Sequence, residues 1–321
     1  MNLLRSLSRL CVLSAAALML AGPARAEYPE NRIKLVVPFP AGGSVDVVAR
    51  LFAEAAGEPF KGRIVVMNKV GASGVLGEAD VARSNPDGYT ILFDAVTIAV
   101  NAALYKKPVY DPDELQPVAM LLSLPFVVVT SSDGPTRTLA EAIDLAKKSP
   151  QGVTTAYAGA STMLAAQLYR LASKSNLHMV AYAGGPAAAL SIMKNETQLY
   201  VSDLPSVSPH IRSGKLRGLA VSTTERAKQH PEIPTAAEAG LPAYRAESWF
   251  GVFARKGTPP DVLNKLNAEI NKFLQKPEII ARLEGLGGRP RPMSVKEFDT
   301  YYAEQRKQWS DVIKQAEIPL Q

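Results

Sequence analysis

The sequence predicts an α/β protein with two domains and mainly parallel sheets. Short β-rich runs alternate along the chain with longer helical patterns, an order that is typical of parallel sheets. The chain has 321 residues, which suits two domains of about 150 residues each. Because the sequence has no Gly/Pro/Ser-rich linker, two extended runs, Leu121 to Val128 and Ala246 to Val252, are predicted to be strands that cross between the domains.

The first 26 residues have the pattern of an export signal. Arg5 and Arg9 form a positively charged start, Leu10 to Leu20 is a short apolar core, and Ala24 to Ala26 is an A-x-A cleavage pattern. A core of this length is too short to cross a bilayer, which takes about 20 residues. We therefore predict a signal peptide at 1–26 and a mature periplasmic protein; the alternative is an uncleaved N-terminal anchor.

The first third of the mature chain predicts three strands. They are Ile33 to Phe39, Ile64 to Met67 and Tyr89 to Phe93. After the first strand, Ser44 is expected to cap a helix whose apolar residues recur every three to four positions. This strand, turn and helix order indicates one parallel sheet.

The middle of the chain repeats this order. Val153 to Tyr157 and Met179 to Tyr182 are predicted strands. A helix is expected to begin near Thr162 after the first of them, and Pro186 suits the first turn of the helix after the second. A capping box that begins at Thr138 opens an earlier helix. These elements predict a second parallel sheet.

After a predicted strand at Trp249 to Ala254, the chain is almost wholly helical. Thr258 is expected to cap one helix with Pro259 at its first position, and a capping box at Ser294 and Glu297 opens the last helix. If these helices return to the first domain, that domain is discontinuous. We expect domain 1 to comprise 27–122 plus 246–321 and domain 2 to comprise 123–245.

Charge and cysteine content argue against several classes of function. The formal net charge is +6, with basic and acidic residues interspersed and no basic stripe, so nucleic-acid binding is not expected. The single cysteine, Cys11, lies in the predicted leader, which removes thiol chemistry from the mature protein. His178, His210 and His230 are scattered without metal-binding spacing. We expect no metal and no cofactor.

Three turns share a design that favours an anion: a strand, a turn of small residues and a helix start. Unpaired N–H groups and the positive end of the helix dipole meet there, and glycine allows close approach to the backbone. Since ligands of open α/β sheets lie at the carboxyl ends of strands, we expect the turns to cluster. The candidate ligand-binding residues in them are Ala41, Gly42, Gly43, Ser44, Asp46, Ala158, Gly159, Ala160, Ser161, Thr162, Gly184, Gly185, Pro186 and Ala187.

Each turn also has a plainer interpretation as an ordinary loop between strand and helix. The same holds for Asp203, which follows a strand-like run: it is either a hydrogen-bond acceptor for the ligand or a helix N-cap. None of the turns matches the nucleotide-binding pattern G-x-x-x-x-G-K-[ST], and the sequence has no G-x-S-x-G elbow of a serine hydrolase. Three such turns together favour a binding site.

The same segments resemble a known family, the periplasmic solute-binding proteins of tripartite tricarboxylate transporters, also called Bug proteins. The resemblance covers essentially the whole mature chain. The segments that carry it are Tyr28-Pro29, VVPFPAGGSVDVVAR (Val36 to Arg50), NPDGYTILF (Asn85 to Phe93), NAALYKKPVYDP (Asn101 to Pro112), LPSVSPHIRSGKLRGLAV (Leu204 to Val221), PTAAEAGLPAY (Pro234 to Tyr244), WFGVFARKGTP (Trp249 to Pro259) and LNAEIN (Leu266 to Asn271).

This resemblance implies a two-domain Venus-flytrap fold of the type II periplasmic-binding-protein kind, without catalytic activity. It implies a small organic carboxylate as ligand, such as a dicarboxylate or an aromatic carboxylate, and membrane transporter subunits as partners. The chain departs from the family pattern at Asp94 to Thr97, at Ser202-Asp203 and at Ala183. These positions lie near the expected pocket, so the identity of the acid stays open.

Our leading hypothesis is a monomeric periplasmic receptor that delivers a small carboxylate to its transporter. Three alternatives stay open at this point. The protein could present its ligand to a signalling receptor, or it could be a secreted α/β hydrolase, which would require a nucleophile and a base in contact. It could also be a scaffold that binds no ligand.

Overall fold

The computed structural model describes residues 28–57, 60, 62–106 and 108–320; the predicted leader, 1–26, lies outside them. The described chain forms ten strands and the helices that cover them. The strands are β1 (Ile33–Val37), β2 (Ile64–Asn68), β3 (Thr90–Ala95), β4 (Leu115–Ser131), β5 (Val153–Tyr157), β6 (Leu177–Ala181), β7 (Leu199–Asp203), β8 (Leu216–Val221), β9 (Glu247–Arg255) and β10 (Arg289–Pro290).

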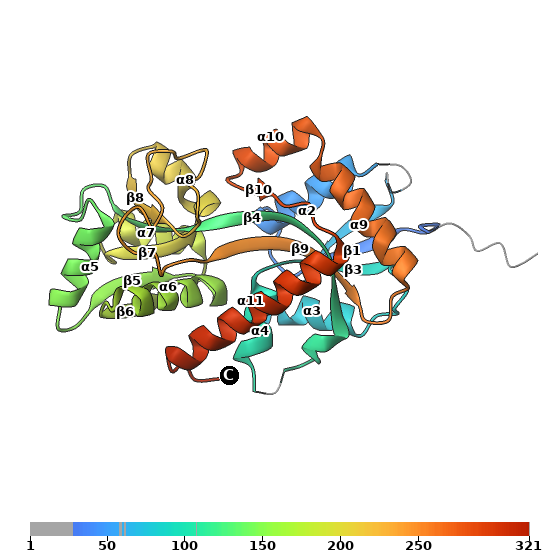
Figure 1. The fold of residues 1–321 in the computed structure, drawn as a ribbon, viewed down its shortest axis with the longest axis horizontal. Coiled ribbons are helices and arrows are strands. Elements are labelled where there is room, and N and C mark those ends of the chain that lie inside the picture. Colours follow the sequence, from blue (N-terminus) through green and yellow to red (C-terminus); the bar gives the residue numbers. More distant parts are fainter. Residues whose placement is uncertain (1–27, 58–59, 61, 107, 321) are drawn as a thin grey trace, which may run out of the picture.

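The strands lie in two lobes that are joined through β4 and β9 (Figure 1). In the first lobe the order is β2-β1-β3-β9-β4, and in the second lobe it is β6-β5-β7-β4-β8. The two orders correspond strand by strand, so each lobe is a version of the same topology. Strands β2, β1 and β3 of the first lobe and β6, β5 and β7 of the second are parallel as predicted. Every pairing made by β4 or β9 is antiparallel, so the sheet as a whole is mixed.

The two predicted crossing strands are confirmed. Leu121 to Val128 lies within β4, whose 17 residues pair with β9 in the first lobe and with β7 and β8 in the second. Ala246 to Val252 corresponds to β9, which begins one residue later, at Glu247. Both strands are rich in β-branched and aromatic residues and almost wholly buried, as expected of central strands.

Helices cover both faces of each lobe (Figure 1). Among them, α11 packs against α4 and β4 of the first lobe and against α6 of the second. The helices are α2 (Ser44–Ala55), α3 (Val75–Ala82), α4 (Thr97–Leu104), α5 (Leu139–Lys148), α6 (Ala160–Ser173), α7 (Gly185–Met193), α8 (Leu204–Arg212), α9 (Pro260–Leu274), α10 (Pro277–Gly285) and α11 (Val295–Gln315), with 3₁₀ turns at Ala72–Gly74 and Pro112–Glu114.

Two of the predicted helix caps are wrong by one residue. Gly43, in an extended conformation, is the N-cap of α2, and Ser44 is its first helical residue. Pro259 is the N-cap of α9, while the Thr258 hydroxyl donates to the Arg255 carbonyl at 2.7 Å. The capping box at Ser294 is confirmed in full.

The cap predicted at Thr138 is confirmed, with one difference. The Thr138 hydroxyl accepts from the Glu141 N–H at 3.2 Å, but the Glu141 carboxylate accepts from the N–H of Arg137 rather than from that of Thr138.

The buried apolar residues of the described chain form three clusters: one lies in the first lobe, one lies in the second lobe, and the third runs through both. The cluster that spans both lobes contains Leu92 and Ile98 of the first lobe, Leu164 and Tyr169 of α6, and Trp309 of α11. Burial of this continuous cluster ties α6 and α11 together, since apolar area removed from water contributes roughly 25 cal/mol per Å². Across the described residues, every helix is too short or too polar to span a membrane.

Candidate ligand-binding site

The carboxyl ends of the parallel strands of both lobes meet near the middle of β4. In the first lobe, Ala95 at the end of β3 aligns through Phe250 of β9 with Leu122. In the second lobe, Asp203 at the end of β7 aligns with Phe126. Four residues of β4 separate these levels, about 13 Å at the rise of a strand. The turns after the strands of one lobe therefore face those of the other.

The first turn, Ala41 to Asp46, is closed by a buried carboxylate. Asp46 is 1% exposed, and its Oδ2 accepts from the Gly42 N–H at 2.8 Å and from Arg50 Nε at 2.9 Å. Its Oδ1 accepts from the Asn68 amide at 2.8 Å. Burial by itself would raise the pKa of Asp46, but these bonds from Arg50, Gly42 and Asn68 hold it below its usual value. Asp46 therefore shapes the turn, and its charge is already compensated.

The second turn, Ala158 to Thr162, is closed in the same way by a neutral group. The Thr162 hydroxyl accepts from the Ala158 N–H at 2.8 Å and donates to the Gly159 carbonyl at 3.3 Å. The first turn of α6 consists of Ala160, Ser161, Thr162 and Met163, so the positive end of its dipole has no carboxylate beside it. Gly159 has φ +95° and faces open space, with no other described atom within 4 Å of an added Cβ. An anion can reach this backbone.

The third turn lies beside the second. Tyr157 and Ala181 are paired in the parallel ladder of β5 and β6, and the Tyr182 N–H donates to the Tyr157 carbonyl at 3.0 Å. Gly184, the N-cap of α7, has φ +155°, a conformation that favours glycine. The first turn of α7 is Gly185, Pro186, Ala187 and Ala188, which is again uncharged. Two neighbouring helix starts thus present amide groups at one edge of the second lobe.

Asp203 completes this edge. It is the N-cap residue of α8 by position, but its side chain makes no capping hydrogen bond. Its Oδ1 is buried and has no hydrogen-bond partner among the described residues. Burial raises the pKa of Asp203 to about 6, and a hydrogen bond from Ser248 of β9 opposes the rise. Asp203 thus occupies the N-cap position without capping the helix through its side chain. Its Oδ1 remains available to accept a hydrogen bond.

The corresponding strand end of the first lobe carries a pair of acids that sequence analysis missed. Asp94, at the end of β3, and Glu78 of α3 are both fully buried. Glu78 accepts from Tyr110 and Asn101, each at 2.8 Å, while Asp94 Oδ1 accepts from the Ala95 N–H at 2.6 Å. Burial raises the pKa of Glu78 to about 7, and burial followed by the charge of Glu78 raises that of Asp94.

A shared proton accounts for this pair. Two carboxyl groups in contact cannot both be ionised in the core, because their charges repel. Both oxygens of Glu78 accept from donors, which favours its ionised form. Asp94 Oδ2 is buried without a hydrogen-bond partner among the described residues. The interaction of the two side chains lowers the pKa of Glu78 and raises that of Asp94, which favours the proton on Asp94. The one signal in the sequence is a carboxylate, Asp94, directly after the apolar run Ile91–Phe93.

A second feature missed from the sequence is a cavity of about 530 Å³ between the lobes. Its walls are the segment 223–229, which follows β8, and the segment 274–292, which contains α10 and β10. Ser123 and Pro125 of β4 and Glu247 of β9 form its floor. Because these parts are distant in sequence, no local pattern could have revealed it.

The remaining titratable candidates are placed as follows. His178 is exposed on β6, and His210 is half-buried in α8. His230 is buried and bonded through its ring nitrogens to Ser208 at 2.7 Å and Glu232 at 2.9 Å. Among the described residues no group of three His, Cys, Asp or Glu side chains is placed to hold a metal ion. The three turns therefore offer backbone amides and hydroxyls, a set that binds anions.

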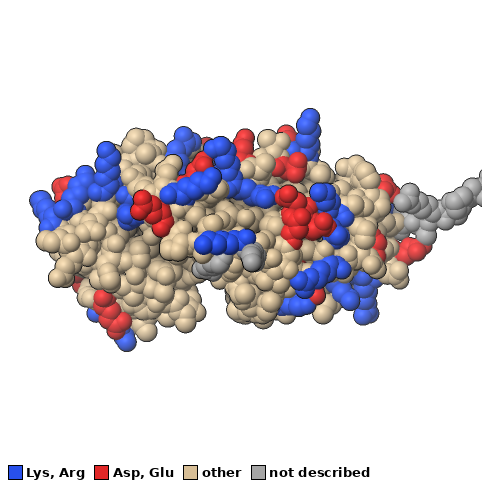
Figure 2. Space-filling view, turned by 90° about the horizontal axis from the view of Figure 1, so that it is seen from below, with Lys and Arg blue, Asp and Glu red and all other residues tan. Residues whose placement is uncertain are grey.

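The surface agrees with two lobes that part on one side. Figure 2 shows a notch between the lobes whose visible walls lack Lys, Arg, Asp and Glu, while basic and acidic side chains are interspersed elsewhere on this face.

This fold, with two similar α/β lobes joined by crossing strands and their strand ends facing each other, defines the class of periplasmic binding proteins. Residues 48–318 match the model of the tripartite tricarboxylate transporter family receptor, and the chain belongs to that family of solute-binding receptors. BugT of Bordetella pertussis is 32% identical over 325 residues, which cover 100% of both chains. The resemblance read from the sequence is thereby confirmed.

Two related structures contain carboxylates. Rpa4515 of R. palustris with adipate is 29% identical, has a TM-score of 0.83, and the match covers 91% of this chain and 99% of that one. MatC of Rhodopseudomonas palustris with bound malate is also 29% identical, with a TM-score of 0.79 and coverage of 89% and 100%.

Proposed function

We propose that this protein is the receptor for a small organic carboxylate, which it binds between its lobes. The observation that carries the proposal is the pair of uncharged helix starts, at α6 and α7, on adjacent strand ends of the second lobe. Such helix starts favour a carboxylate through unpaired N–H groups and the helix dipole. The adipate and malate of the two relatives support the same chemical class.

In this proposal the ligand lies among four groups of residues. The turn Ala41 to Asp46 contributes from the first lobe, and the turns Ala158 to Thr162 and Gly184 to Ala187 contribute from the second. Asp203, with its unpartnered buried oxygen, lies at the floor between them. The amides of the second lobe hold the carboxylate, and the first lobe covers it when the cleft closes.

The lobes act as domains that move about the crossing strands. Domain 1 comprises 27–122 plus 246–321, and domain 2 comprises 123–245. Hinge closure around a ligand is the usual motion of two-domain receptors. The closed form then presents the surface that the subunits of a membrane transporter recognise, and the protein acts as a monomer. Residues 1–26 direct export to the periplasm and are removed.

A thermal-shift screen tests this proposal. Dicarboxylates, aromatic carboxylates and amino acids are added singly to the purified mature protein. A ligand at 100 times its Kd stabilises the folded state by about 2.7 kcal/mol. We expect at least one acid to raise the Tm and to be recovered chemically unchanged. If every acid leaves the Tm where it was, or if the acid is converted, the proposal is wrong.

A matched pair of variants locates the site. Gly159→Ala places a methyl group on the exposed positive-φ glycine of the second turn, whereas Gly240→Ala does the same at a positive-φ glycine with equally open surroundings, away from the three turns. Both substitutions cost about 1 kcal/mol of stability. We expect only Gly159→Ala to weaken binding of the acid.

A further inference from the structure

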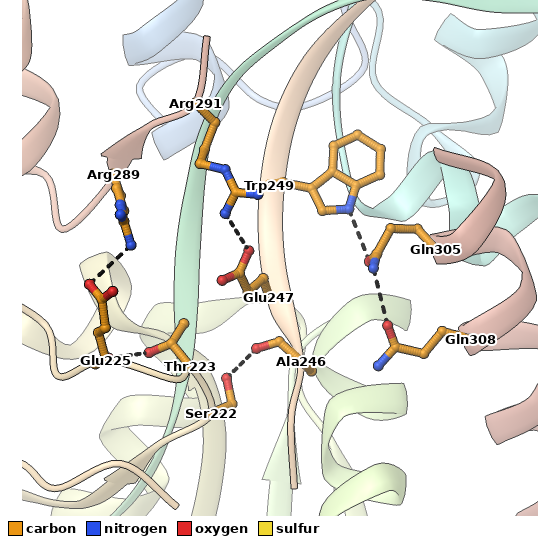
Figure 3. A network of polar contacts seen from close by, with 10 residues as sticks. All are labelled: Ser222, Thr223, Glu225, Ala246, Glu247, Trp249, Arg289, Arg291, Gln305 and Gln308. Carbon is orange, nitrogen blue, oxygen red and sulfur yellow. Dashed lines mark hydrogen bonds and ion pairs between the residues drawn. The ribbon is translucent and has the colours of Figure 1, made fainter. Parts of the chain in front are cut away.

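The lobes touch at a charged contact beside the cavity between them. From the second lobe, Lys228 pairs with Glu284 of α10 at 2.5 Å, and the Gln229 amide donates to the Glu284 carbonyl. Arg289 of β10 pairs with Glu225 at 3.0 Å (Figure 3). We call these contacts, between the segment 223–229 and the segment 284–289, the rear contact.

The rear contact and the proposed ligand site lie on opposite faces of β4. Side chains alternate between the two faces along a strand, and residues paired across strands share a face. Asp203 pairs with Phe126, and Ser248 pairs with Leu124. The cavity beside the rear contact is floored by Ser123, Pro125 and Glu247, which pairs with Pro125, so it lies on the other face. Arg289, paired with Ser123, shares that face.

The rear contact has the chemistry of an interface that can separate, not that of a ligand site. Each of the charged partners Lys228, Glu284, Glu225 and Arg289 is already paired across the lobes. Lys228 and Arg289 have side chains that are 76% and 64% exposed, so the pairs are weak and screened by salt. The lobes also meet where α4 and α11 pack against α6, and there a continuous apolar cluster joins them.

Beside the rear contact, Ser222 links β4 to Ala246, the residue that directly precedes β9. The Ser222 hydroxyl donates to the Ala246 carbonyl at 2.6 Å (Figure 3). It also accepts from the Phe126 N–H at 3.0 Å. These buried hydrogen bonds lie where the chain crosses between the lobes, so they mark the level about which the proposed closure would turn the lobes. Rotation that brings the lobes together on the ligand face must separate them on the opposite face, where the rear contact lies.

We propose that the rear contact is a latch that holds the receptor open and is released when the cleft closes. The latch lowers the population of the closed form in the absence of ligand, so it reduces the apparent affinity for the ligand. The part concerning affinity rests on the proposed function, whereas the part concerning the open form does not.

The open form is tested without ligand. The described chain contains no cysteine, so Lys147→Cys in α5 and Asn264→Cys in α9, both exposed, place a pair of dyes on the two lobes. The variant Lys228→Gln/Arg289→Gln removes both ion pairs. We expect it to raise the population with a short distance between the dyes by about two- to tenfold, the range for two exposed pairs.

Two controls give the test its direction. Lys307→Gln breaks an exposed pair with Asp311 inside α11 and is expected to leave the distances unchanged. Lys228→Glu is expected to favour the closed form, and the exchange Lys228→Glu/Glu284→Lys is expected to restore the open form. Unchanged or longer distances in Lys228→Gln/Arg289→Gln, or an equal shift in Lys307→Gln, would overturn the latch.

Ligand binding gives the second readout. With an acid found in the thermal-shift screen, Lys228→Gln/Arg289→Gln is expected to bind about two- to tenfold more tightly than the parent, and less so at high salt. If no acid binds the parent, the proposed function fails, but the dye distances still decide whether the latch exists. If the acid binds and the affinities are equal, the latch does not regulate the site.

Discussion

The two lobes carry the same turn at the same place, but they close it with different chemistry. In the first lobe the Asp46 carboxylate accepts the N–H of Gly42, four residues earlier. In the second lobe the Thr162 hydroxyl accepts the N–H of Ala158, again four residues earlier. Both turns follow the first strand of their lobe, β1 or β5, and both open a helix. The geometry is shared, so the difference lies in the charge.

In the proposed function, this difference gives the two lobes different roles in binding the ligand. A carboxylate in the first turn of α2 occupies the positive end of the helix dipole, where a ligand anion would otherwise be favoured. Arg50 compensates that charge at 2.9 Å. The starts of α6 and α7 carry no such carboxylate within their described first turns. In the proposed function, the second lobe therefore supplies most of the attraction for the carboxylate and the first lobe supplies shape.

The largest expected effect comes from removing the Asp46 carboxylate, which closes the turn of the first lobe. Asp46→Ala leaves Gly42, Arg50 and Asn68 without their shared acceptor, which we expect to lower the free energy of unfolding by about 2–3 kcal/mol. The control Asp80→Ala, which breaks an exposed pair with Lys69, should lose less than about 1 kcal/mol. Urea unfolding measures both.

The pH dependence identifies the cause. Because the pKa of Asp46 is lowered in the folded state, its contribution is present above its unfolded-state pKa and is lost as the pH falls through the folded value. The gap between the parent and Asp46→Ala should therefore narrow below about pH 4. A gap that stays constant down to pH 2 would mean that Asp46 acts through packing.

Much of the fold could be predicted from the sequence because its signals are local. The strand Val153–Tyr157 and the capping box at Ser294 depend on neighbouring residues and were found where expected. The crossing strands could be predicted because long apolar runs, and not a flexible linker, connect the two domains in the sequence. The caps at Ser44 and Thr258 were misplaced since glycine or proline took the N-cap, and their hydroxyl neighbours gave a misleading signal.

The site was less predictable, because its details depend on contacts between distant residues. The turn Ala41 to Asp46 was recognised as a candidate, but that Asp46 would be satisfied by Asn68, 22 residues away, could not be read locally. Likewise the pairing of Glu78 with Asp94 and that of Lys228 with Glu284 arise only from folding. Whether the predicted residues bind the ligand stays a prediction.

The acids at corresponding strand ends extend the comparison. In the first lobe Asp94 is buried beside Glu78 and the pKa of each is raised, which indicates a proton shared between them, whereas Asp203 is a single acid in the second lobe. Raised pKa values mean that the contribution of Asp94 and Glu78 is present below their unfolded-state pKa and is lost as the pH rises through the folded values, about 7 for Glu78. The parent should lose stability between about pH 5 and 8.

Asp94→Asn should remove much of this loss. The amide keeps the acceptor for the Ala95 N–H and offers an N–H to Glu78 at every pH. We expect the variant to exceed the parent by about 1–2 kcal/mol at pH 8 and to match it near pH 5. Urea unfolding across this range checks it, and parallel pH profiles for the two proteins would exclude the shared proton.

A third prediction makes the second lobe resemble the first. Ser161→Asp places a carboxylate in the first turn of α6, where the helix start is otherwise uncharged. If this lobe attracts the anion, the Kd for the bound acid should rise at least about tenfold. Ser161→Asn, of the same size but neutral, should change it by less than about threefold. Equal effects of the two variants would show that size rather than charge matters there.

The smallest expected effect comes from removing the Thr162 hydroxyl, which closes the turn of the second lobe. Thr162→Val keeps the shape of the side chain but leaves the Ala158 N–H without its acceptor, which we expect to cost about 1 kcal/mol in unfolding free energy and a few-fold in affinity. Thr162→Ser keeps the hydroxyl and should lie within about 0.5 kcal/mol of the parent. Both are measured by urea unfolding and by titration with the acid. If Thr162→Ser weakens binding as much as Thr162→Val, the methyl group and not the hydrogen bond holds the turn, and the likeness of the two closures would be one of position alone.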